Sequence, residues 1–330
     1  MTASQVSPEP SPQCNPSTVC ILGAGSMGLL WASQLAHSHS VTLINKMPQP
    51  NRQLAFSVQQ EDQLTQARIT SLTVAEVSAP ISHLLVCTKS YDAARAVTEI
   101  HPKLDPTANI LLLQNGLGSQ AEVSQQLLEA GLGEAHVYAL STTEAANKSS
   151  ATRVIYAGKG CSWLGPYNDP ARQNNRAKSL AQSLALSGLT VLDEEQIQHR
   201  LWRKLIINCG INPFTVLFNC RNGDILDKPL FIDHIDALAM ELELISRHAG
   251  NHIQWQQIKA DIIDVASKTK ANISSTLQDV RAGRPTEMNY LNGYISRYAE
   301  THGLSAPVNR MLCNWLDESH FQSKPDQPDR

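Results

Sequence analysis

Short apolar runs alternate with helical patterns over the first 195 residues of the chain. The early runs are continuously apolar, which is typical of parallel strands buried on both faces of a sheet. Because helical periodicity separates these runs, the pattern predicts repeated β–α units and a protein of the α/β class. We expect strands at residues 18–22, 40–45, 83–88, 109–114, 135–140, 153–158, 161–165 and 189–192.

The pattern changes near Asp193-Glu194-Glu195, where the strand signals end. Beyond this point the apolar residues follow the helical period, and 330 residues are enough for two domains. The sequence therefore predicts an α/β domain over residues 18–195 and an all-α domain over residues 196–330. We expect helices at residues 196–219, 228–250, 254–270, 272–281, 286–302 and 306–318.

A glycine pattern follows the first predicted strand and opens a helical pattern. In a strand–turn–helix unit, the first glycine permits the tight turn and the second lets the backbone approach a pyrophosphate. The third lets the helix pack close to the strand. The free N–H groups at the helix start then hold the phosphates. This context favours a Rossmann-type dinucleotide-binding domain over an ordinary turn, with the cofactor held by Gly23, Ala24, Gly25, Ser26, Met27 and Gly28.

The end of the second predicted strand indicates which dinucleotide is bound. NAD enzymes usually place an acidic residue about 20 residues beyond the glycines, where it binds the ribose 2′-hydroxyl. This chain has Lys46 there, and no acidic residue lies between Glu9 and Glu61. A cation without a competing carboxylate suits a 2′-phosphate, so we expect NADP as the cofactor. The alternative for Lys46 is a solvated surface lysine.

Two further strand ends carry polar residues that could reach a ligand. Lys89 follows one apolar run, and Asn115-Gly116 follows the next. Ligands of open α/β sheets bind outside the carboxyl ends of the strands, which favours a functional role for these residues. Asn-Gly is also a common plain turn, so this alternative stays open for Asn115.

A lysine and two amides define one face of the first helix of the second domain. Lys204, Asn208 and Asn212 are four residues apart, and no charged residue occurs from Leu205 to Cys220. The helix is therefore expected to be mostly buried, and Pro213 is expected to break it just after Asn212, so that Asn212 projects into an interdomain cleft. Buried amides need partners, which a ligand or the neighbouring backbone can supply. A lysine beside apolar residues can act as a proton donor.

Two residues near the last predicted helices have a functional and a structural interpretation. Ser275 could bind a carboxylate, or it could begin a helix. Glu287 is expected in the first turn of the helix over residues 286–302, where an acidic side chain also compensates the helix dipole.

Composition excludes several classes of protein. The formal net charge is −3 and no basic tract is present, which argues against nucleic acid as a partner. No apolar run approaches the roughly 18 residues needed to span a bilayer. The first 17 residues are rich in Ser, Pro and Gln without a signal-peptide pattern, so we expect a disordered tail. Seven cysteines without a CxxC pair fit a cytoplasmic protein. His248 and His252 have no evident third ligand, so no metal site is predicted.

Taken in order, these motifs resemble the ketopantoate reductase (2-dehydropantoate 2-reductase) family from about Val19 to the last helix. The resemblance adds the segments Lys46-Met47-Pro48-Gln49-Pro50, Thr88-Lys89, Gln114-Asn115-Gly116-Leu117-Gly118 and Leu201-Trp202-Arg203-Lys204 through Asn222-Gly223. It ends with Ile273-Ser274-Ser275 through Asp279-Val280-Arg281, and Thr286-Glu287 through Asn292-Gly293. The family implies a C-terminal helical domain like that of 6-phosphogluconate dehydrogenase and a cleft between the domains.

The resemblance also implies roles for individual residues. Lys204 would be the catalytic proton donor. The substrate would be held by Asn115, Lys204, Asn208, Asn212, Asn222 and Ser275. The cofactor would also contact Lys89, Asn115, Ala146 and Glu287. Lys46 stands where arginine is common in the family.

The predicted function is NADPH-dependent reduction of 2-dehydropantoate to (R)-pantoate for pantothenate and coenzyme A synthesis, by a cytoplasmic monomer or homodimer. One alternative is a reductase of another branched 2-oxo acid, since relatives could share the motifs and differ in the pocket. Another is a non-catalytic NADPH sensor, which would need the glycine turn but neither Lys204 nor the row of amides.

Overall fold

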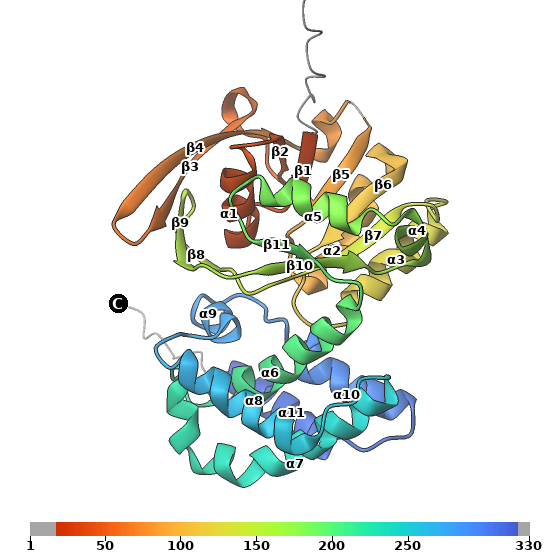
Figure 1. The fold of residues 1–330 in the computed structure, drawn as a ribbon. Helices are drawn as coiled ribbons and strands as arrows, with labels where there is room; N and C mark the ends of the chain where they lie inside the picture. The colour runs from red at the N-terminus through yellow and green to blue at the C-terminus, as the bar shows by residue number, and fades with distance from the viewer. Residues whose placement is uncertain (1–17, 79, 323–330) are drawn as a thin grey trace, which may run out of the picture.

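The computed structural model describes residues 18–78 and 80–322, which form an α/β domain above a helical domain (Figure 1). The tail predicted for residues 1–17 lies outside the described residues. The strands are β1 (Thr18–Leu22), β2 (Ser40–Ile44), β3 (Gln53–Gln60), β4 (Gln63–Leu72), β5 (Ile81–Val86), β6 (Leu104–Leu112), β7 (His136–Thr142), β8 (Ala145–Ser150), β9 (Arg153–Gly158), β10 (Ser162–Pro166) and β11 (Val191–Asp193).

The helices of the α/β domain are α1 (Ser26–Leu35), α2 (Ser90–Ile100), α3 (Ser119–Glu129), α4 (Asp169–Asn174) and α5 (Ala177–Ala185). Those of the helical domain are α6 (Ile197–Leu217), α7 (Pro229–His248), α8 (Trp255–Lys268), α9 (Ser275–Arg281), α10 (Asn292–Thr301) and α11 (Pro307–Gln322). None of the described helices is both long enough and apolar enough to cross a membrane. The predicted order, an α/β half followed by a helical half, is confirmed.

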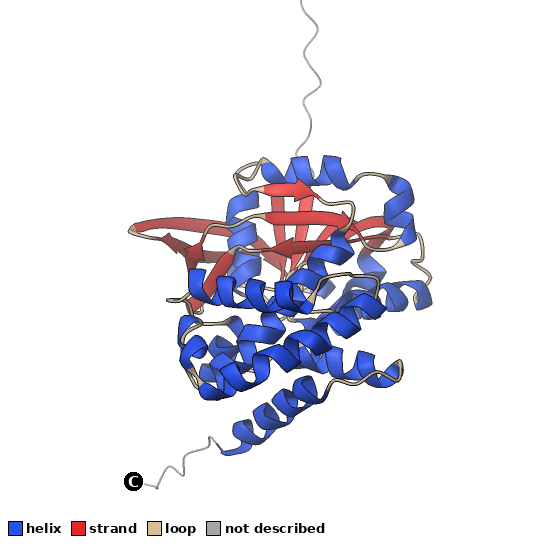
Figure 2. Ribbon diagram, turned by 60° about the horizontal axis from the view of Figure 1, so that its bottom comes forward, coloured by secondary structure: helices blue, strands red, loops and turns tan. Residues whose placement is uncertain are grey.

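The described strands form one sheet in the order β11-β10-β7-β6-β5-β1-β2-β4-β3-β9-β8. Strands β6, β5, β1 and β2 are parallel neighbours. Their side chains alternate between two cores: Ile21 and Leu85 pack on one face, and Leu84 and Ile110 on the other. Figure 2 shows helices on both sides of these strands. Burial on both faces explains why the runs are continuously apolar.

Helix α1 lies between the central strands and the far end of the same sheet. It packs against β1 and β2 and also against β8 and β9, which curve around it (Figure 1). Its buried residues run from Gly28 to Ser33 without a break and include Trp31, which is fully buried. A helix buried on all sides is apolar all round. The arrangement fixes the start of α1 beside the carboxyl end of β1.

Strands β3, β4 and β8 were not among the predicted strands. Their sequences are polar because one side of each strand faces solvent. In β3 only Phe56 and Val58 are buried, and the first four residues of β4 are exposed. β8 has no buried residue. A search for continuous apolar runs therefore misses them.

The helix predicted over residues 196–219 corresponds to α6, but the break predicted at Pro213 is wrong, because the helix continues through it to Leu217. A proline inside a helix leaves the carbonyl four residues earlier without its N–H donor, here that of Cys209. The buried Asn292 supplies the donor from its Nδ2, 3.2 Å from the Cys209 oxygen. A side chain 83 positions away in the sequence thus satisfies the interrupted helix.

The helix predicted over residues 286–302 is also interrupted. A 3₁₀ turn, Met288–Tyr290, precedes α10, and Leu291 between them is not helical. The break frees the Tyr290 carbonyl, which accepts a hydrogen bond from the Leu117 N–H at 3.0 Å. This contact joins the helical domain to the loop that follows β6.

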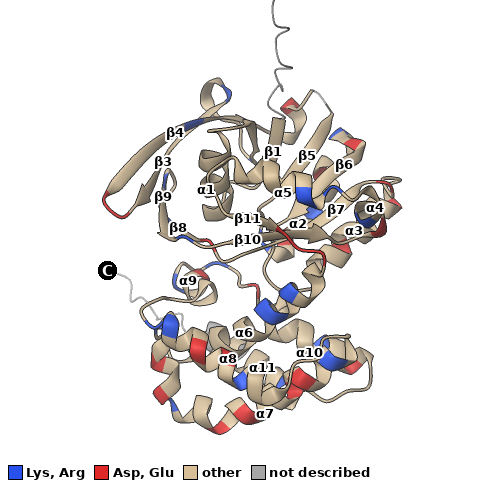
Figure 3. Ribbon diagram, in the orientation of Figure 1, with Lys and Arg blue, Asp and Glu red and all other residues tan. Residues whose placement is uncertain are grey.

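In the view of Figure 3, charged residues of both signs lie mainly on the helices, and the strands carry few.

Candidate active site

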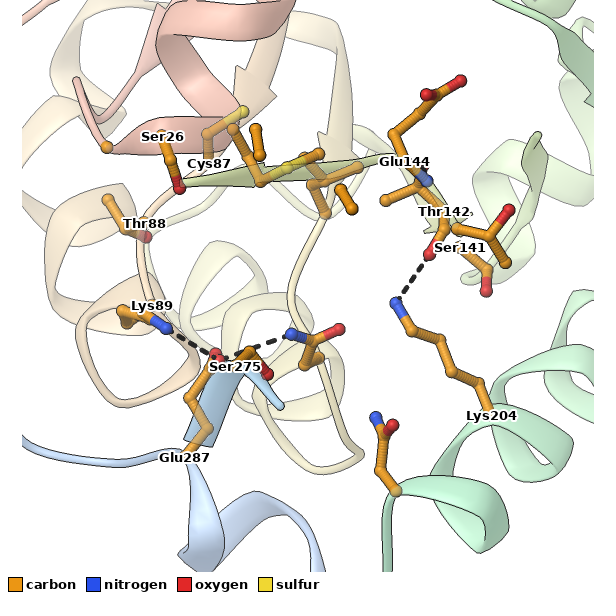
Figure 4. Close-up of a pocket in the computed structure, with 18 of the residues that line it drawn as sticks. Ser26, Cys87, Thr88, Lys89, Ser141, Thr142, Glu144, Lys204, Ser275 and Glu287 are labelled. Atoms are coloured by element: carbon orange, nitrogen blue, oxygen red, sulfur yellow. Dashed lines mark hydrogen bonds and ion pairs between the residues drawn. The ribbon is translucent and has the colours of Figure 1, made fainter. Parts of the chain in front are cut away.

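A cavity of about 940 Å³ lies between the two domains. Its α/β wall includes the glycine turn, the carboxyl ends of β2, β5, β6 and β7, and parts of α2 and β8. Its helical wall consists of α6, α8, the start of α9 and Glu287. Figure 4 shows side chains of both walls facing one another across this space. The topology thus brings the predicted strand ends and the predicted helix face to one place.

The glycine turn has the geometry that a dinucleotide requires. Gly23 has a φ of +108°, and an added Cβ would lie 3.0 Å from the Thr88 backbone nitrogen. A Cβ on Gly28 would lie 1.9 Å from the Gly23 carbonyl oxygen. Helix α1 has no side-chain cap at Gly25, so no capping side chain occupies the N–H groups of its first turn, which open beside the cavity. The residues present fit a bound pyrophosphate.

Lys46 follows β2 and lines the cavity, with 70% of its side chain exposed. The expectation that no carboxylate competes there is wrong. Asp92 of α2 also lines the cavity, and its Oδ2 lies 3.9 Å from the Lys46 Nζ. The residues near Lys46 in the sequence contain no acid, but Asp92 belongs to α2, a helix that starts after β5 and lies far from Lys46 in the sequence. The end of β2 therefore has a positive side chain, Lys46, and a negative side chain, Asp92, beside each other.

Lys89 joins the two domains. Its Nζ donates to the Asp279 Oδ2 at 2.6 Å and to the Glu287 Oε2 at 3.3 Å. Both carboxylates are buried, with 4% and 6% of their side chains exposed. Burial alone would lower the pKa of Lys89, but the charges of Glu287 and Asp279 raise it above its usual value. Lys89 is therefore a protonated bridge at the cavity wall.

Glu287 is not in the first turn of a helix, contrary to the sequence prediction. It precedes the 3₁₀ turn, and its buried carboxylate faces the α/β domain. Oε1 accepts a hydrogen bond from the Ser90 N–H at 3.0 Å and lies 2.7 Å from the Ser90 hydroxyl. Oε2 lies 3.5 Å from the Asn115 Nδ2. Dipole compensation does not explain these contacts, whereas a cross-domain role does.

Lys204 extends from α6 toward the end of β7 (Figure 4). Its Nζ donates to the Thr142 carbonyl oxygen at 2.9 Å. Burial lowers the pKa of Lys204 to about 8, partly opposed by the charge of Glu287. A pKa near neutrality suits a group that gives and regains a proton. The structure thus places an ammonium group at the cavity that Lys89, Glu287 and Asn115 also line.

The structure brings some of the predicted site residues to the cavity and leaves others away from it. The residues that line it are Gly23, Ala24, Gly25, Ser26, Met27, Lys46, Lys89, Asn115, Ala146, Lys204, Asn208, Ser275 and Glu287. Ser275 is the first residue of α9, but the cap is formed by Ser274, whose hydroxyl accepts from the Leu277 N–H. The Ser275 side chain faces the cavity (Figure 4).

Asn212 and Asn222 are not part of the cavity wall. The Asn212 Nδ2 donates to the Thr276 Oγ1 at 3.0 Å, and the residue is 6% exposed. The Asn222 Nδ2 donates to the Thr269 Oγ1 at 2.9 Å. The expected projection of Asn212 into the cleft rested on a break in the helix at Pro213, and the helix continues without one. Contact of these two amides with a substrate stays a prediction.

We expect Asn212→Ala to lower the stability of the fold by about 1–3 kcal/mol, because it leaves the Thr276 hydroxyl without a buried partner. Thermal unfolding of the variant measures this loss, and Asn208→Ala serves as the matched control from the cavity face of the same helix. A normal melting temperature together with a raised substrate Michaelis constant for Asn212→Ala would contradict this expectation.

Four residues at the site were not predicted as functional. Asp279 anchors Lys89, and Arg284 donates to its other oxygen at 3.0 Å. Ser90 contacts Glu287, and Thr142 presents its carbonyl to Lys204. Adjacency to Lys89 could have indicated Ser90. No sequence signal marks a backbone carbonyl such as that of Thr142.

The fold and this cavity define a dinucleotide-binding protein of the oxidoreductase type, with a glycine turn on one wall and a lysine on the other. The sequence matches the family described as "Ketopantoate reductase PanE/ApbA" over residues 19–169, and its C-terminal part, "Ketopantoate reductase PanE/ApbA C terminal", over residues 196–320. The chain belongs to the ketopantoate reductase family.

A curated relative agrees with this assignment, and two solved structures share the fold. The chain is 32% identical over 295 residues to a 2-dehydropantoate 2-reductase of Yersinia pestis, covering 89% of this chain and 92% of the relative. A solved PanE/ApbA family ketopantoate reductase from Ralstonia eutropha JMP134 is similar in fold, with a TM-score of 0.79, 24% identity, and coverage of 93% and 100%. A D-mandelate dehydrogenase solved with NADH and anilino(oxo)acetate has a TM-score of 0.81 at 19% identity, with coverage of 92% and 99%.

Proposed function

We propose that this chain is an NADP-dependent 2-dehydropantoate 2-reductase. It reduces 2-dehydropantoate to (R)-pantoate, with NADPH as the hydride donor, as a cytoplasmic step toward pantothenate and coenzyme A. The observation that carries the proposal is the position of Lys204. Its ammonium group lies inside a cavity whose opposite wall is a dinucleotide-binding turn. The relative of Yersinia pestis that is 32% identical to this chain is a 2-dehydropantoate 2-reductase, which supports the proposal.

The residues of this chain would act on the substrate from both walls. A nicotinamide dinucleotide, held by its pyrophosphate at the glycine turn, would supply the hydride. As the ketone is reduced, negative charge develops on its oxygen, and the Lys204 ammonium stabilises that charge and then gives up a proton from Nζ. The Nζ carries three N–H donors and uses one on the Thr142 carbonyl, so it can donate another to the ketone oxygen. Asn115, Asn208 and Ser275 line the same cavity and would orient the carboxylate and hydroxyl of the substrate.

The proposal is tested by steady-state oxidation of NADPH with a panel of 2-oxo acids, including 2-dehydropantoate and branched acids that lack its hydroxyl. We expect the highest kcat/KM for 2-dehydropantoate. A higher value for another branched 2-oxo acid would assign the pocket to that substrate instead. Cofactor binding without turnover of any acid would support the sensor alternative.

Lys46→Ala should weaken NADPH binding and leave NADH binding nearly unchanged. The ammonium group adds a charge-assisted contact that only the 2′-phosphate can use, and at a side chain that is 70% exposed such a contact contributes about 0.2–1 kcal/mol. The Michaelis constants for the two cofactors measure the effect. Equal responses of NADPH and NADH would show that Lys46 does not discriminate between them.

A further inference from the structure

At one end of the cavity, the carboxylate of Asp92 forms an ion pair with the ammonium group of Lys46. Asp92 is the third residue of α2, and its Oδ2 lies 3.9 Å from the Lys46 Nζ. Both residues line the cavity. The other carboxylate oxygen of Asp92 accepts from the Arg95 Nη2 at 2.6 Å. The side chain of Asp92 is 31% exposed, so it is less solvated than that of Lys46.

The two charges favour different forms of the ribose. A cation at this position attracts a 2′-phosphate, whereas a carboxylate accepts hydrogen bonds from a free 2′-hydroxyl. A phosphate that contacts Lys46 lies within a few ångströms of Asp92 and is repelled by it. The positive charge of Arg95 offsets part of this repulsion, but Arg95 already donates one N–H to Asp92 and another to Glu99. The site therefore contains one attractive and one repulsive element for NADPH.

We infer that Asp92 keeps the preference for NADPH over NADH small, by opposing the 2′-phosphate and by accepting a hydrogen bond from the 2′-hydroxyl of NADH. The inference rests on the proposed use of a nicotinamide dinucleotide and assigns a specificity role to a residue of α2. The wild-type chain should bind NADH with a dissociation constant within about tenfold of that for NADPH, a margin that one opposing charge at contact distance can produce.

The test measures direct binding of each reduced cofactor to the full chain in the absence of substrate. Nicotinamide fluorescence is the readout. Asp92→Asn should tighten NADPH, weaken NADH and so raise the ratio of their dissociation constants about tenfold in favour of NADPH. Asp92→Glu, which retains the charge, should keep a ratio near that of wild type. The change should shrink at high salt, because both groups are partly exposed.

Glu300→Gln is the matched control. It removes the same charge from an exposed position on α10 of the helical domain, and Glu300 does not line the cavity. It should therefore change the ratio much less than Asp92→Asn. Thermal unfolding of each variant separates this role from simple compensation of the α2 dipole, because lost dipole compensation lowers stability without changing the ratio.

Two results would overturn the inference. An Asp92→Asn variant with an unchanged ratio, or with equal changes for both cofactors, would remove Asp92 as a determinant while leaving the proposed function intact. Failure of the wild-type chain to bind either cofactor would reject the proposed function and this inference together.

Discussion

Lys204→Ala is expected to reduce turnover by about 100-fold or more, the usual scale for loss of a positioned acid. The Nζ of Lys204 lies inside the cavity and donates to a carbonyl on the opposite wall, at 2.9 Å from the Thr142 oxygen. Truncation removes both the positive charge and the proton that the reduced oxygen would receive. The fold should survive, because the side chain extends into an open cavity rather than into a packed core.

Steady-state rates and a thermal melt of the same preparation measure the two effects. Lys178→Ala is a suitable control, because it removes an exposed lysine of α5 that does not line the cavity. It should leave turnover unchanged. Near-normal turnover of Lys204→Ala would reject Lys204 as the proton donor and direct attention to Glu287.

The lowered pKa of Lys204 also predicts the pH dependence. The residue must be protonated to act as an acid, and burial places its pKa at about 8. The rate of reduction should therefore be constant below pH 8 and fall about tenfold per unit above it. Residual activity of Lys204→Ala should lack this decline. A decline that persists in the variant would assign the titration to another group.

Much of the fold could be predicted because its central strands are buried on both faces. Their apolar runs carry the signal without any tertiary information. The strands that were missed lie toward one end of the sheet, where Phe56 and Val58 are the buried residues of an otherwise polar strand. The continuation of α6 through Pro213 depends on Asn292, whose position relative to Cys209 is a tertiary fact. Local pattern cannot supply such contacts.

The site shows the same division. The glycine turn and Lys46 are local signals, and the resemblance to a known family supplied the role of Lys204. What could not be predicted is which residues meet across elements. Asp92 reaches Lys46, and Glu287 reaches Ser90 across the domain boundary. These pairings determine the charge around the cofactor and the approach of the two domains, and each joins segments far apart in the sequence.

Gly116→Ala is expected to have the largest effect on stability among the substitutions considered. Gly116 has a φ of +79°, and an added Cβ would lie 2.0 Å from the Tyr290 carbonyl oxygen. That oxygen accepts the Leu117 N–H at 3.0 Å and so joins the two domains. A methyl group at this position must displace backbone on one side of the contact. We expect a loss of about 3 kcal/mol or more in the free energy of unfolding.

Gly131→Ala separates the two causes of this loss. Gly131 has nearly the same conformation, with a φ of +78°, but an added Cβ would meet no described atom within 4 Å. It should lose only the roughly 1–2 kcal/mol of a left-handed alanine. The excess for Gly116→Ala then measures the clash with Tyr290, and the Michaelis constant for the substrate should rise with it, because Asn115 is the adjacent residue. Equal losses of unfolding free energy in the two variants would show that the backbone around Leu117 and Tyr290 can move to accept the methyl group without further loss of stability. In that case the domains are held together by the bridge from Lys89 and Ser90 to Asp279 and Glu287 instead.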